Sequence, residues 1–532
     1  MLSIQGVTYI HPNGDRLLSG LDFAISKFDK IALVGNNGVG KSTLLKLIAG
    51  HLVPSSGSVI SGFRPYLVPQ VTGQFKAMTL AQALGVDEKL NALKEVLQGI
   101  VSERNLEIVG ADWTLEERCA EAFDSWKLPA LDLSDSINEL SGGEKTKVLL
   151  AGLIIHKPDL VLLDEPSNHL DSAGRKLLYE YVTSSRQSMV IVSHDRALLN
   201  LVSATYELSN KGIKAYGGNY DFYEAQKAIE KNAMTEEIRS QEKLLRKAKE
   251  LARETVERKE KLDARGHRKQ EKAGIATIMM NTLRNNAEKS SARLKGVHAE
   301  KIDEISRNLK SLRSEVVESD TMKLNLDESR LHHGKILVTA KDLNVSFDRG
   351  KLWNNDVSFE IRSGERVAIA GANGSGKTTL IRLLLGISAQ SHGTIQRATC
   401  RSVYIDQNYA LLDNALTVFE QAQLYNSDLL PEHEMKIRLN RFLFTKADWD
   451  KSVVLLSGGE KMRLLLCLLA IGTQAPDMIV LDEPTNNLDL ANLEMLTRAI
   501  SQYRGTLIVV SHDERFLDEV GIGRRLELHA TR

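Results

Sequence analysis

The sequence predicts an α/β protein in which one type of domain occurs twice, with a long helical segment between the copies. The first observation is an apolar strand that runs into a glycine-rich loop and then a helix, found at 31–49 and again at 367–385. The second is a block of similar sequence at 138–171 and 455–489. The third is the segment from about 223 to 336, which is rich in the helix-favouring residues Lys, Arg, Glu and Ala.

Length and composition narrow the class of protein. At 532 residues the chain is too long for one hydrophobic core, and its 42% hydrophobic and 26% charged residues are ordinary for a globular protein with a formal net charge of +0. The three cysteines, Cys119, Cys400 and Cys467, form no CxxC, which argues against a disulfide framework, a zinc ribbon or an iron–sulfur domain. No signal-peptide pattern opens the chain, and no apolar run approaches the roughly 20 residues of a membrane span. We therefore expect a soluble protein in a reducing cytoplasm.

Each glycine-rich loop has the GxxxxGK[ST] spacing of a phosphate-binding loop. Glycines let the backbone curl so that its N–H groups face a phosphate chain, while Lys41 and Lys377 would reach the β- and γ-phosphates. A chance glycine-rich turn is the alternative, but the strand before and the helix after each loop argue against it, and so does the repetition. The predicted nucleotide-binding residues are Gly35, Asn36, Gly38, Gly40, Lys41, Ser42 and Thr43 in the first copy, and Gly371, Asn373, Gly374, Gly376, Lys377, Thr378 and Thr379 in the second.

A pair of acids follows an apolar strand in each copy. Asp164 and Asp482 would lie at the carboxyl end of their strands beside Mg²⁺, and Glu165 and Glu483 would polarise the attacking water. A helix N-cap is the alternative for each pair, but the proline that follows at once opposes it. The predicted Mg²⁺-site residues are Ser42, Gln70 and Asp164 in the first copy and Thr378, Gln407 and Asp482 in the second. The glutamines are the weaker prediction, since each is a single-residue signal.

Two further pairs of residues are candidates for nucleotide contacts. His194 and His512 each follow an apolar strand at the same distance after the acid pair, which favours a γ-phosphate sensor over a structural histidine. Tyr9 and Phe347 occupy matching positions and would stack on adenine. For both aromatic residues, a core side chain on a strand is nearly as good an interpretation.

Between the copies, residues 223–336 predict two long helices packed antiparallel. Ile302, Ile305, Leu309, Leu312 and Val316 have 3-4-3-4 spacing, typical of a helical seam. Residues 241–300 hold 16 Lys and Arg against 9 Asp and Glu, a local net charge of +7. A solvated helical hairpin explains most of these charges. RNA phosphates are the functional alternative for the tip at 264–291, with candidate contacts at Arg265, His267, Arg268, Lys269 and Lys272.

The spacing of the motifs locates one insertion. Between the glutamine and the LSGGE motif the first copy carries about 21 more residues than the second. We expect a helical, charged surface insertion within about 85–120. The predicted domains are 1–222, the linker 223–336, and 337–532.

The order of phosphate loop, glutamine, LSGGE, Asp-Glu, D-loop and histidine, found twice, resembles the ATP-binding cassette superfamily. LSGGE separates that superfamily from other P-loop proteins. The resemblance implies two cassettes that close head to tail within one chain, with ATP and Mg²⁺ held between them. Ser457, Gly458 and Gly459 would then face the ATP on Lys41, and Ser141, Gly142 and Gly143 the ATP on Lys377.

Two cassettes without a membrane segment, joined by a long charged helical linker, resemble the ABC-F subfamily. That resemblance implies an ATPase that binds the ribosome when closed on ATP, with its linker toward rRNA and the P-site tRNA, and leaves on hydrolysis. Both roles found in the subfamily stay open, translation factor and protection from antibiotics. The alternative is the ATPase subunit of a transporter with separate membrane subunits. One departure is Asn487 in the second D-loop, where the first has His169.

Overall fold

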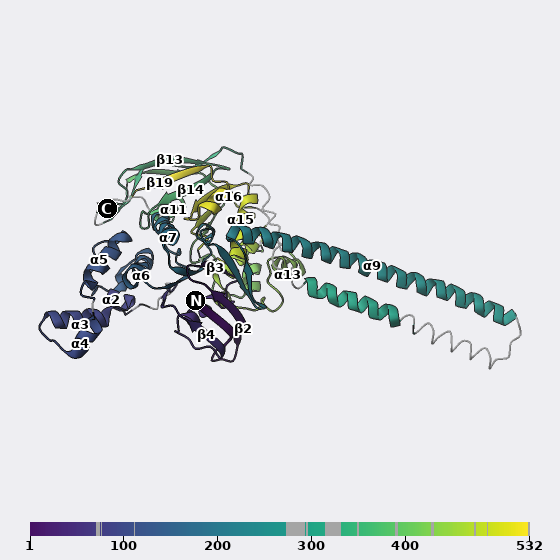
Figure 1. Cartoon of the computed structure of the whole chain (residues 1–532). Helices are drawn as coiled ribbons and strands as arrows, with labels where there is room; N and C mark the ends of the chain where they lie inside the picture. The colour runs from purple at the N-terminus through teal and green to yellow at the C-terminus, as the bar shows by residue number, and fades with distance from the viewer. Residues whose placement is uncertain are drawn as a thin grey trace. The chain divides into compact units, whose positions relative to one another are not determined.

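The computed structural model describes residues 1–70, 75, 77–110, 112–272, 293, 296–313, 331–347, 350–388, 392–426, 430–472, 475–486 and 488–529, without the side chains of 263, 266–272 and 347. This chain divides into two compact units, Met1–Tyr223 with Met322–Arg532, and Glu224–Thr321. The first unit holds both copies of the repeated domain, here called the first copy (β1 to β9) and the second copy (β10 to β19). Figure 1 shows these elements along the chain.

The first copy contains two sheets and a helical layer. A three-stranded antiparallel sheet has the order β2-β1-β4, and a six-stranded sheet has the order β5-β6-β7-β3-β8-β9, parallel except for β9. Its elements are β1 Leu2–Ile10, β2 Arg16–Ile25, β3 Lys30–Val34, α1 Lys41–Ile48, β4 Ser56–Ser61, β5 Pro65–Val68, α2 Leu80–Leu84, α3 Asp87–Leu97, α4 Glu103–Val109, α5 Leu115–Ser125, η1 Ile137–Glu139, α6 Gly142–His156, β6 Leu160–Asp164, α7 Ser172–Ser184, β7 Ser188–Val192, α8 Arg196–Leu199, β8 Ala204–Ser209 and β9 Gly212–Tyr216.

The second copy repeats this plan. Its antiparallel sheet has the order β13-β10-β15, its parallel sheet the order β16-β17-β18-β14-β19, and β11 pairs with β12. Its elements are β10 Ile336–Asn344, β11 Ser346–Phe347, β12 Gly350–Lys351, β13 Val357–Arg362, β14 Arg366–Gly371, α11 Lys377–Leu384, β15 His392–Arg397, β16 Ser402–Ile405, α12 Val418–Leu424, α13 Glu432–Arg441, η2 Val453–Leu455, α14 Gly458–Ile471, β17 Met478–Asp482, α15 Leu490–Gln502, β18 Thr506–Val510, α16 Glu514–Glu519 and β19 Arg524–Leu528. The matching strand orders confirm the predicted α/β fold with a duplicated domain.

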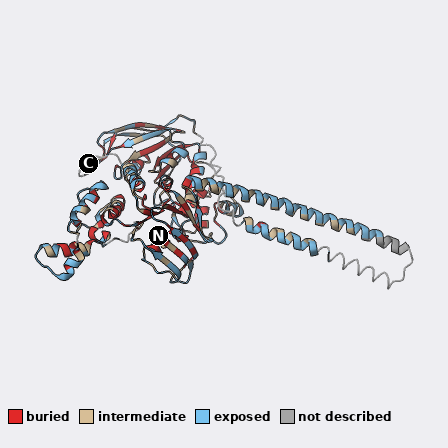
Figure 2. Ribbon diagram, in the orientation of Figure 1, coloured by how far each residue is buried: buried red, intermediate tan, exposed pale blue. Residues whose placement is uncertain are grey.

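The central strands are apolar throughout because both faces of the parallel sheet are covered. Along β6, Leu160 and Leu162 join the core cluster that contains the antiparallel sheet and α1. The alternating Val161 and Leu163 join the cluster that contains α6 and α7. Figure 2 shows these strands as buried residues between exposed layers. Burial on two faces makes these strands rigid supports for the loops at their ends.

The insertion in the first copy is only partly a surface feature. Helices α3, α4 and α5 precede α6, where the second copy has α13 before α14. Leu90, Leu93, Val109 and Leu115 are almost completely buried in the main core cluster of the first copy. The expectation of a charged surface insertion is therefore wrong for the inner face of these helices, whose apolar residues extend the core.

The second unit contains most of α9 (Tyr220–Lys272) and the helical residues 296–313. Leu309 is buried, and the other described seam residues, Ile302, Ile305 and Leu312, are half-buried. Arg313 forms an ion pair with Glu242 at 2.6 Å, so the later segment returns along α9. Most of the remaining surface of α9 is exposed (Figure 2). Val316 lies outside the described residues.

Candidate functional site

The predicted motifs of each copy meet at one edge of its parallel sheet. In the first copy, β3, β6 and β7 are neighbours, and their carboxyl ends carry the phosphate loop, the acid pair and His194. In the second copy β14, β17 and β18 carry the matching groups. Because parallel strands end at the same edge, motifs far apart in the sequence come together there.

A cavity of about 460 Å³ lies at this edge of the first copy. It contains nine of the predicted residues and five that the sequence did not single out. The lining residues are His11, Leu17, Asn37, Gly38, Gly40, Lys41, Ser42, Thr43, Gln70, Asp164, Glu165, Asn168, Val192 and His194. The group Ser457, Gly458 and Gly459 is not among them, although Asn37 N–H donates to Asp489 Oδ2 of the second copy at 3.2 Å.

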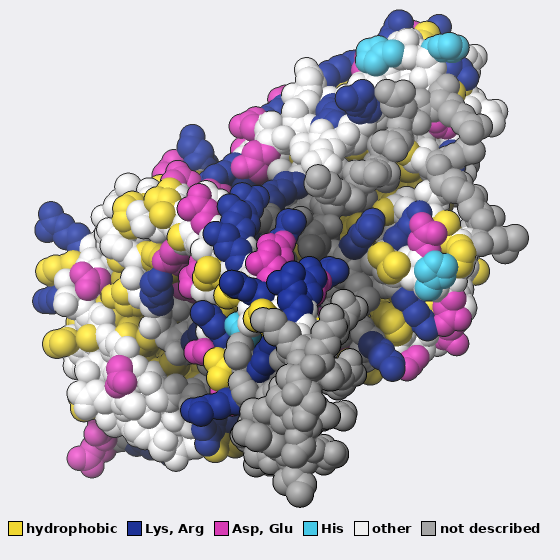
Figure 3. Space-filling model, turned by 90° about the vertical axis from the view of Figure 1, so that its right-hand side faces the viewer, with side chains coloured by type: hydrophobic (Ala, Val, Ile, Leu, Met, Phe, Trp, Pro, Cys, Tyr) yellow, Lys and Arg dark blue, Asp and Glu magenta, His cyan; other side chains and the backbone are white. Residues whose placement is uncertain are grey.

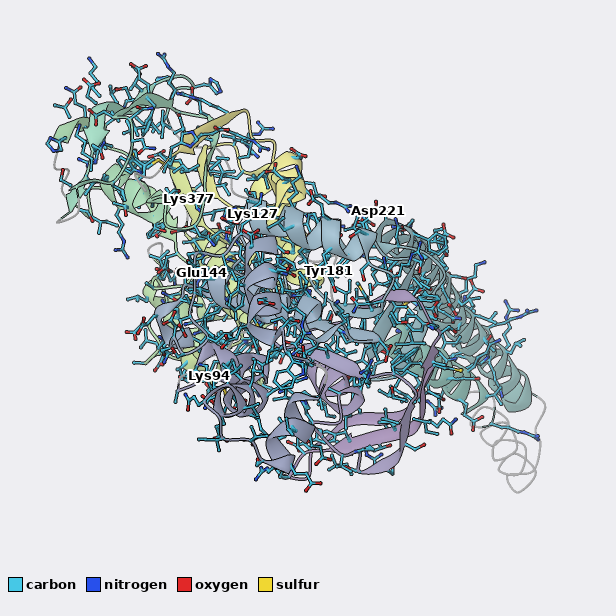
Figure 4. The ribbon with its side chains drawn as sticks, turned by 60° about the vertical axis from the view of Figure 1, so that its left-hand side comes forward. Lys94, Lys127, Glu144, Tyr181, Asp221 and Lys377 are labelled. Atoms are coloured by element: carbon cyan, nitrogen blue, oxygen red, sulfur yellow. The ribbon has the colours of Figure 1, made fainter. Side chains whose placement is uncertain are left out.

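A second cavity of about 450 Å³ draws on both copies. Ser141, Gly142 and Gly143 of the first copy line it together with the phosphate loop of the second. The remaining lining residues are His169, Leu170, Leu352, Asn373, Gly374, Ser375, Gly376, Lys377, Thr378, Thr379, Gln407, Asp482, Glu483, Asn486 and His512. The LSGGE segment of one copy thus faces the phosphate loop of the other. Figure 4 labels Glu144 of the LSGGE segment and Lys377.

The phosphate loops have the geometry of anion-binding turns. Lys41 Nζ donates to the carbonyls of Gly35 and Asn36 at 2.6 and 3.1 Å, and Lys377 does the same with Gly371 and Ala372. A Cβ added to Gly35 would lie 2.4 Å from the carbonyl oxygen of Leu208, so glycine is required there. Helices α1 and α11 begin at the two lysines without a side-chain cap, which leaves their first N–H groups available to an anion.

The acids beside these loops have the features of a cation site. Thr378 Oγ1 and the Tyr404 hydroxyl donate to Asp482 Oδ2 at 2.8 and 3.0 Å. Burial raises the pKa of Asp164, against a hydrogen bond from Ser42 that lowers it. Asp164 Oδ1 is buried and has no hydrogen-bond partner in the described part of the chain. A hydroxyl and a carboxylate oxygen are hard ligands suited to Mg²⁺, which keeps several waters.

Each acid that follows is buried against a histidine. Glu165 Oε1 lies 3.2 Å from His194 Nε2, and Glu483 Oε1 lies 3.4 Å from His512 Nε2. Burial raises the pKa of Glu165 to about 8 and of Glu483 to about 7. Burial lowers the pKa of His194 to about 3 and of His512 to about 4. Near neutral pH both histidines are therefore uncharged, and both carboxyls are close to their titration range.

The helix-cap interpretation of the acid pairs is wrong, because other residues cap the helices that follow. Asp171 caps α7 and Asp489 caps α15. Glu165 and Glu483 adopt left-handed φ values of 51° and 50°, with their N–H groups bonded to the carbonyls of Val192 and Val510. A left-handed φ at a non-glycine residue costs on the order of 1–3 kcal/mol.

The LSGGE serines begin long helices. Ser141 Oγ accepts from Glu144 N–H at 3.3 Å while Glu144 Oε2 accepts from Ser141 N–H at 2.8 Å, a capping box repeated by Ser457 and Glu460. A Cβ on Gly143 would lie 2.8 Å from the carbonyl oxygen of His169. A side chain at this position would therefore collide with the D-loop.

Besides the contact between Asn37 and Asp489, further polar contacts join the two copies near the cavities. Asn373 Nδ2 donates to the carbonyl of His169 at 2.7 Å. Ser172 Oγ lies 3.3 Å from His512 Nδ1. The guanidinium of Arg196, two residues after His194, makes a bidentate pair with Glu519 at 2.8 and 2.9 Å.

The ion pairs continue to the first turn of α9. Arg515 bonds to Glu519 at 3.1 Å and to Asp221 at 2.8 Å, and Figure 4 labels Asp221. Tyr223, two residues further, donates to Glu207 of the first copy at 3.1 Å. The segments that follow the two histidines are thus linked to the start of the long helix.

Some of the other predicted residues do not line either cavity. Others lie outside the described residues. Tyr9 is half-buried against the core cluster and lies edge-on to His11, which lines the first cavity in its place, so the core interpretation fits Tyr9 better. Phe347 belongs to β11, but its side chain is outside the described residues, as is Asn487. Arg265 is exposed on α9. The side chains of His267, Arg268, Lys269 and Lys272, and the tip beyond 272, lie outside the described part.

Within the described residues, no helix is both long enough and apolar enough to cross a membrane.

The family profile described as ABC transporter matches residues 18–168 and 354–486.

Two relatives and one solved structure are similar to this chain over most of its length. It is 30% identical to ABC transporter F family member 2 of Arabidopsis thaliana, over 97% of this chain and 74% of that one. It is 28% identical to the ribosome protection protein VmlR of Bacillus subtilis, over 93% and 81%. The crystal structure of the complex of archaeal ribosomal stalk protein aP1 and archaeal ribosome recycling factor aABCE1 shares the fold, with TM-score 0.57, 22% identity, and 97% and 86% coverage. The chain belongs to the ABC-F family of ATP-binding cassette proteins.

Proposed function

We propose that this protein hydrolyses ATP with Mg²⁺ at two composite sites and that its closed, ATP-bound form binds the ribosome. The observation that carries the first part is the second cavity, in which Ser141, Gly142 and Gly143 of one copy face Lys377 of the other. We propose domains of 1–222, a helical hairpin linker 223–336 that packs as a coiled coil, and 337–532. The two cassettes pair within one chain in the cytoplasm.

The residues of each site have different roles, which follow from their chemistry. Lys41 and Lys377, with the N–H groups at the starts of α1 and α11, hold the phosphates. Ser42, Gln70 and Asp164 hold Mg²⁺ at one site, and Thr378, Gln407 and Asp482 at the other. Mg²⁺ supplies charge neutralisation at the β- and γ-phosphates.

The paired carboxyl and histidine position the attacking water. Glu165 and Glu483 lie next to the predicted metal ligands, and each carboxyl group has its Oε1 within 3.4 Å of the Nε2 of a histidine. A carboxyl with a pKa near neutral pH is suited to accept a proton from water as it attacks. His194 and His512, being neutral, can donate one N–H to the γ-phosphate.

The ribosome is proposed from the names of relatives and from the charge of the linker. One relative is named a ribosome protection protein, and the solved structure concerns a ribosome recycling factor. The net charge of +7 in 241–300 suits rRNA and the P-site tRNA. In the middle of the face shown in Figure 3, dark blue Lys and Arg side chains lie together with some magenta Asp and Glu side chains.

The test uses the double variant Glu165→Gln with Glu483→Gln. It keeps the residues that hold phosphates, so it should bind ATP but stay closed. We expect ATP-dependent sedimentation with ribosomes, stronger than that of the wild type. Failure to sediment, with ATP binding intact, would reject the ribosome as partner while leaving the ATPase open. ATPase activity that depends on membrane subunits would favour the transporter alternative.

A second experiment addresses the linker. Neutralising Arg265, Arg268, Lys269 and Lys272 together should lower ribosome-stimulated ATPase more than basal ATPase, because basal turnover needs only the cassettes. Equal loss of both activities would favour the solvated-hairpin interpretation. Antibiotic susceptibility of cells that express the protein would separate a protective role from a general translation role.

A further inference from the structure

The histidine of the second site is contacted from the other copy. Ser172, the first residue of α7 in the first copy, places its Oγ 3.3 Å from His512 Nδ1. His512 Nε2 lies 3.4 Å from Lys377 Nζ and 3.4 Å from Glu483 Oε1. Both ring nitrogens of His512 therefore face a polar group, one from each copy.

Among the residues that the structure describes, the first site has no matching contact. Leu490 stands as far after Ser172 as His512 stands after His194, so it is the matching residue. Its side chain has no polar atom and packs against the apolar core cluster of the first copy. His194 Nδ1 is buried and has no hydrogen-bond partner within the described residues. The two sites thus differ at one pair of matching residues, which is the polar Ser172 for the second site and the apolar Leu490 for the first.

A hydroxyl suits His512 because the ring must change its hydrogen-bonding pattern. Where the Lys377 ammonium donates to Nε2, the ring proton lies on Nδ1 and Ser172 Oγ is the acceptor. When a γ-phosphate oxygen faces Nε2, that nitrogen must donate, so Nδ1 must accept. A serine hydroxyl can be either donor or acceptor, so it can pair with Nδ1 in both tautomers.

We propose that Ser172 is a positioning residue for the second ATP site, where it orients His512 in both tautomers across the boundary between the copies. Leu490 has no hydroxyl to offer His194, so only the second site has a histidine oriented in this way. The inference rests on the proposed ATP hydrolysis and names a residue that acts on one site of the pair.

The experiment compares four variants by steady-state ATP hydrolysis. Losing one hydrogen bond to a catalytic group should lower kcat of Ser172→Ala by about threefold to tenfold, with a change in KM for ATP below about twofold. Ser172→Thr keeps the hydroxyl and should restore most of kcat. Ser184→Ala, at the other end of α7, removes a hydroxyl bonded to Glu180 within the same helix and is the matched control. The reciprocal Leu490→Ser supplies a hydroxyl to His194 and should not lower kcat.

Variants in which only one ATP site is active show which site loses activity when Ser172 is replaced. Glu165→Gln leaves turnover to the second site and Glu483→Gln to the first, so the loss from Ser172→Ala should be larger in the Glu165→Gln protein. A Ser172→Thr variant as slow as Ser172→Ala, or equal losses in the two backgrounds, would overturn the proposal. If both single-site proteins are inactive, the Thr rescue in the wild-type background decides. A wild-type protein without ATPase activity would instead reject the proposed function.

Discussion

Replacing Glu165 by glutamine should stabilise the nucleotide-free protein, and increasingly so as the pH rises. Burial raises the pKa of Glu165 from an ordinary 4.5 to about 8. Between these values the folded protein keeps a proton that the unfolded chain releases, so the wild type loses stability as pH increases. Glutamine has no such proton. The stability difference therefore grows with pH in favour of the variant and becomes constant above the folded-state pKa.

The size of the effect follows from proton linkage. One retained proton changes the free energy of unfolding by about 1.4 kcal/mol per pH unit. Between pH 5.5 and 7.5 the variant should gain about 2 to 3 kcal/mol over the wild type. His194, whose pKa burial lowers to about 3, stays uncharged in both folded proteins over this range. Its contribution is therefore the same in both and cancels in the comparison.

Calorimetry without nucleotide measures the prediction. A change of 1 kcal/mol shifts the melting temperature of a domain of this size by about 2–4 °C, so the difference should widen by roughly 4–12 °C between pH 5.5 and 7.5. Glu180→Gln makes the same chemical change at an exposed position on α7 and serves as the control. A difference between the wild type and Glu165→Gln that stays constant or shrinks over this range would refute the assignment of a buried, protonated carboxyl.

Three further perturbations follow from the described contacts. Gly143→Val places a branched side chain against a main-chain carbonyl that a Cβ alone would approach to 2.8 Å, so ATPase turnover should fall more than about tenfold, and unchanged turnover would contradict the tight contact. Glu519→Gln removes the carboxylate from the buried guanidinium of Arg196 and should cost about 2 kcal/mol in urea unfolding, whereas no loss would mean that water replaces the pair. Thr378→Ala removes a hydroxyl beside Asp482 and should raise the Mg²⁺ concentration for half-maximal ATPase by about tenfold, and an unchanged Mg²⁺ titration would exclude this ligand.

The sequence predicted well those features that depend on local spacing. Strand, glycine-rich loop and helix follow one another within about 20 residues, and the apolar strands before Asp164 and His194 are buried on both faces. Parallel pairing then brings their ends together without further information. The duplication served as an internal check, because an isolated motif rarely recurs with its whole order intact.

Contacts that depend on how the copies pack could not be predicted. Ser172 and His512 are separated by most of the chain, and nothing in the residues near either one signals the other. The same holds for Arg196 and Glu519. His11 was missed because it lies beyond the end of β1, where the alternation of strand residues gives no guidance. The inner faces of α3 to α5 were misjudged because their charged residues masked a set of apolar residues with helical spacing.

The first turn of α9 has a mechanical consequence. The helix continues without interruption for 53 residues, which corresponds to a rod of about 80 Å at 1.5 Å per residue. Asp221 at its start is bound by Arg515, three residues after the second histidine, and Tyr223 by Glu207 of the first copy. The first turn of α9 is therefore held by both copies, so a change in the spacing between the copies must stretch or break one of these two contacts.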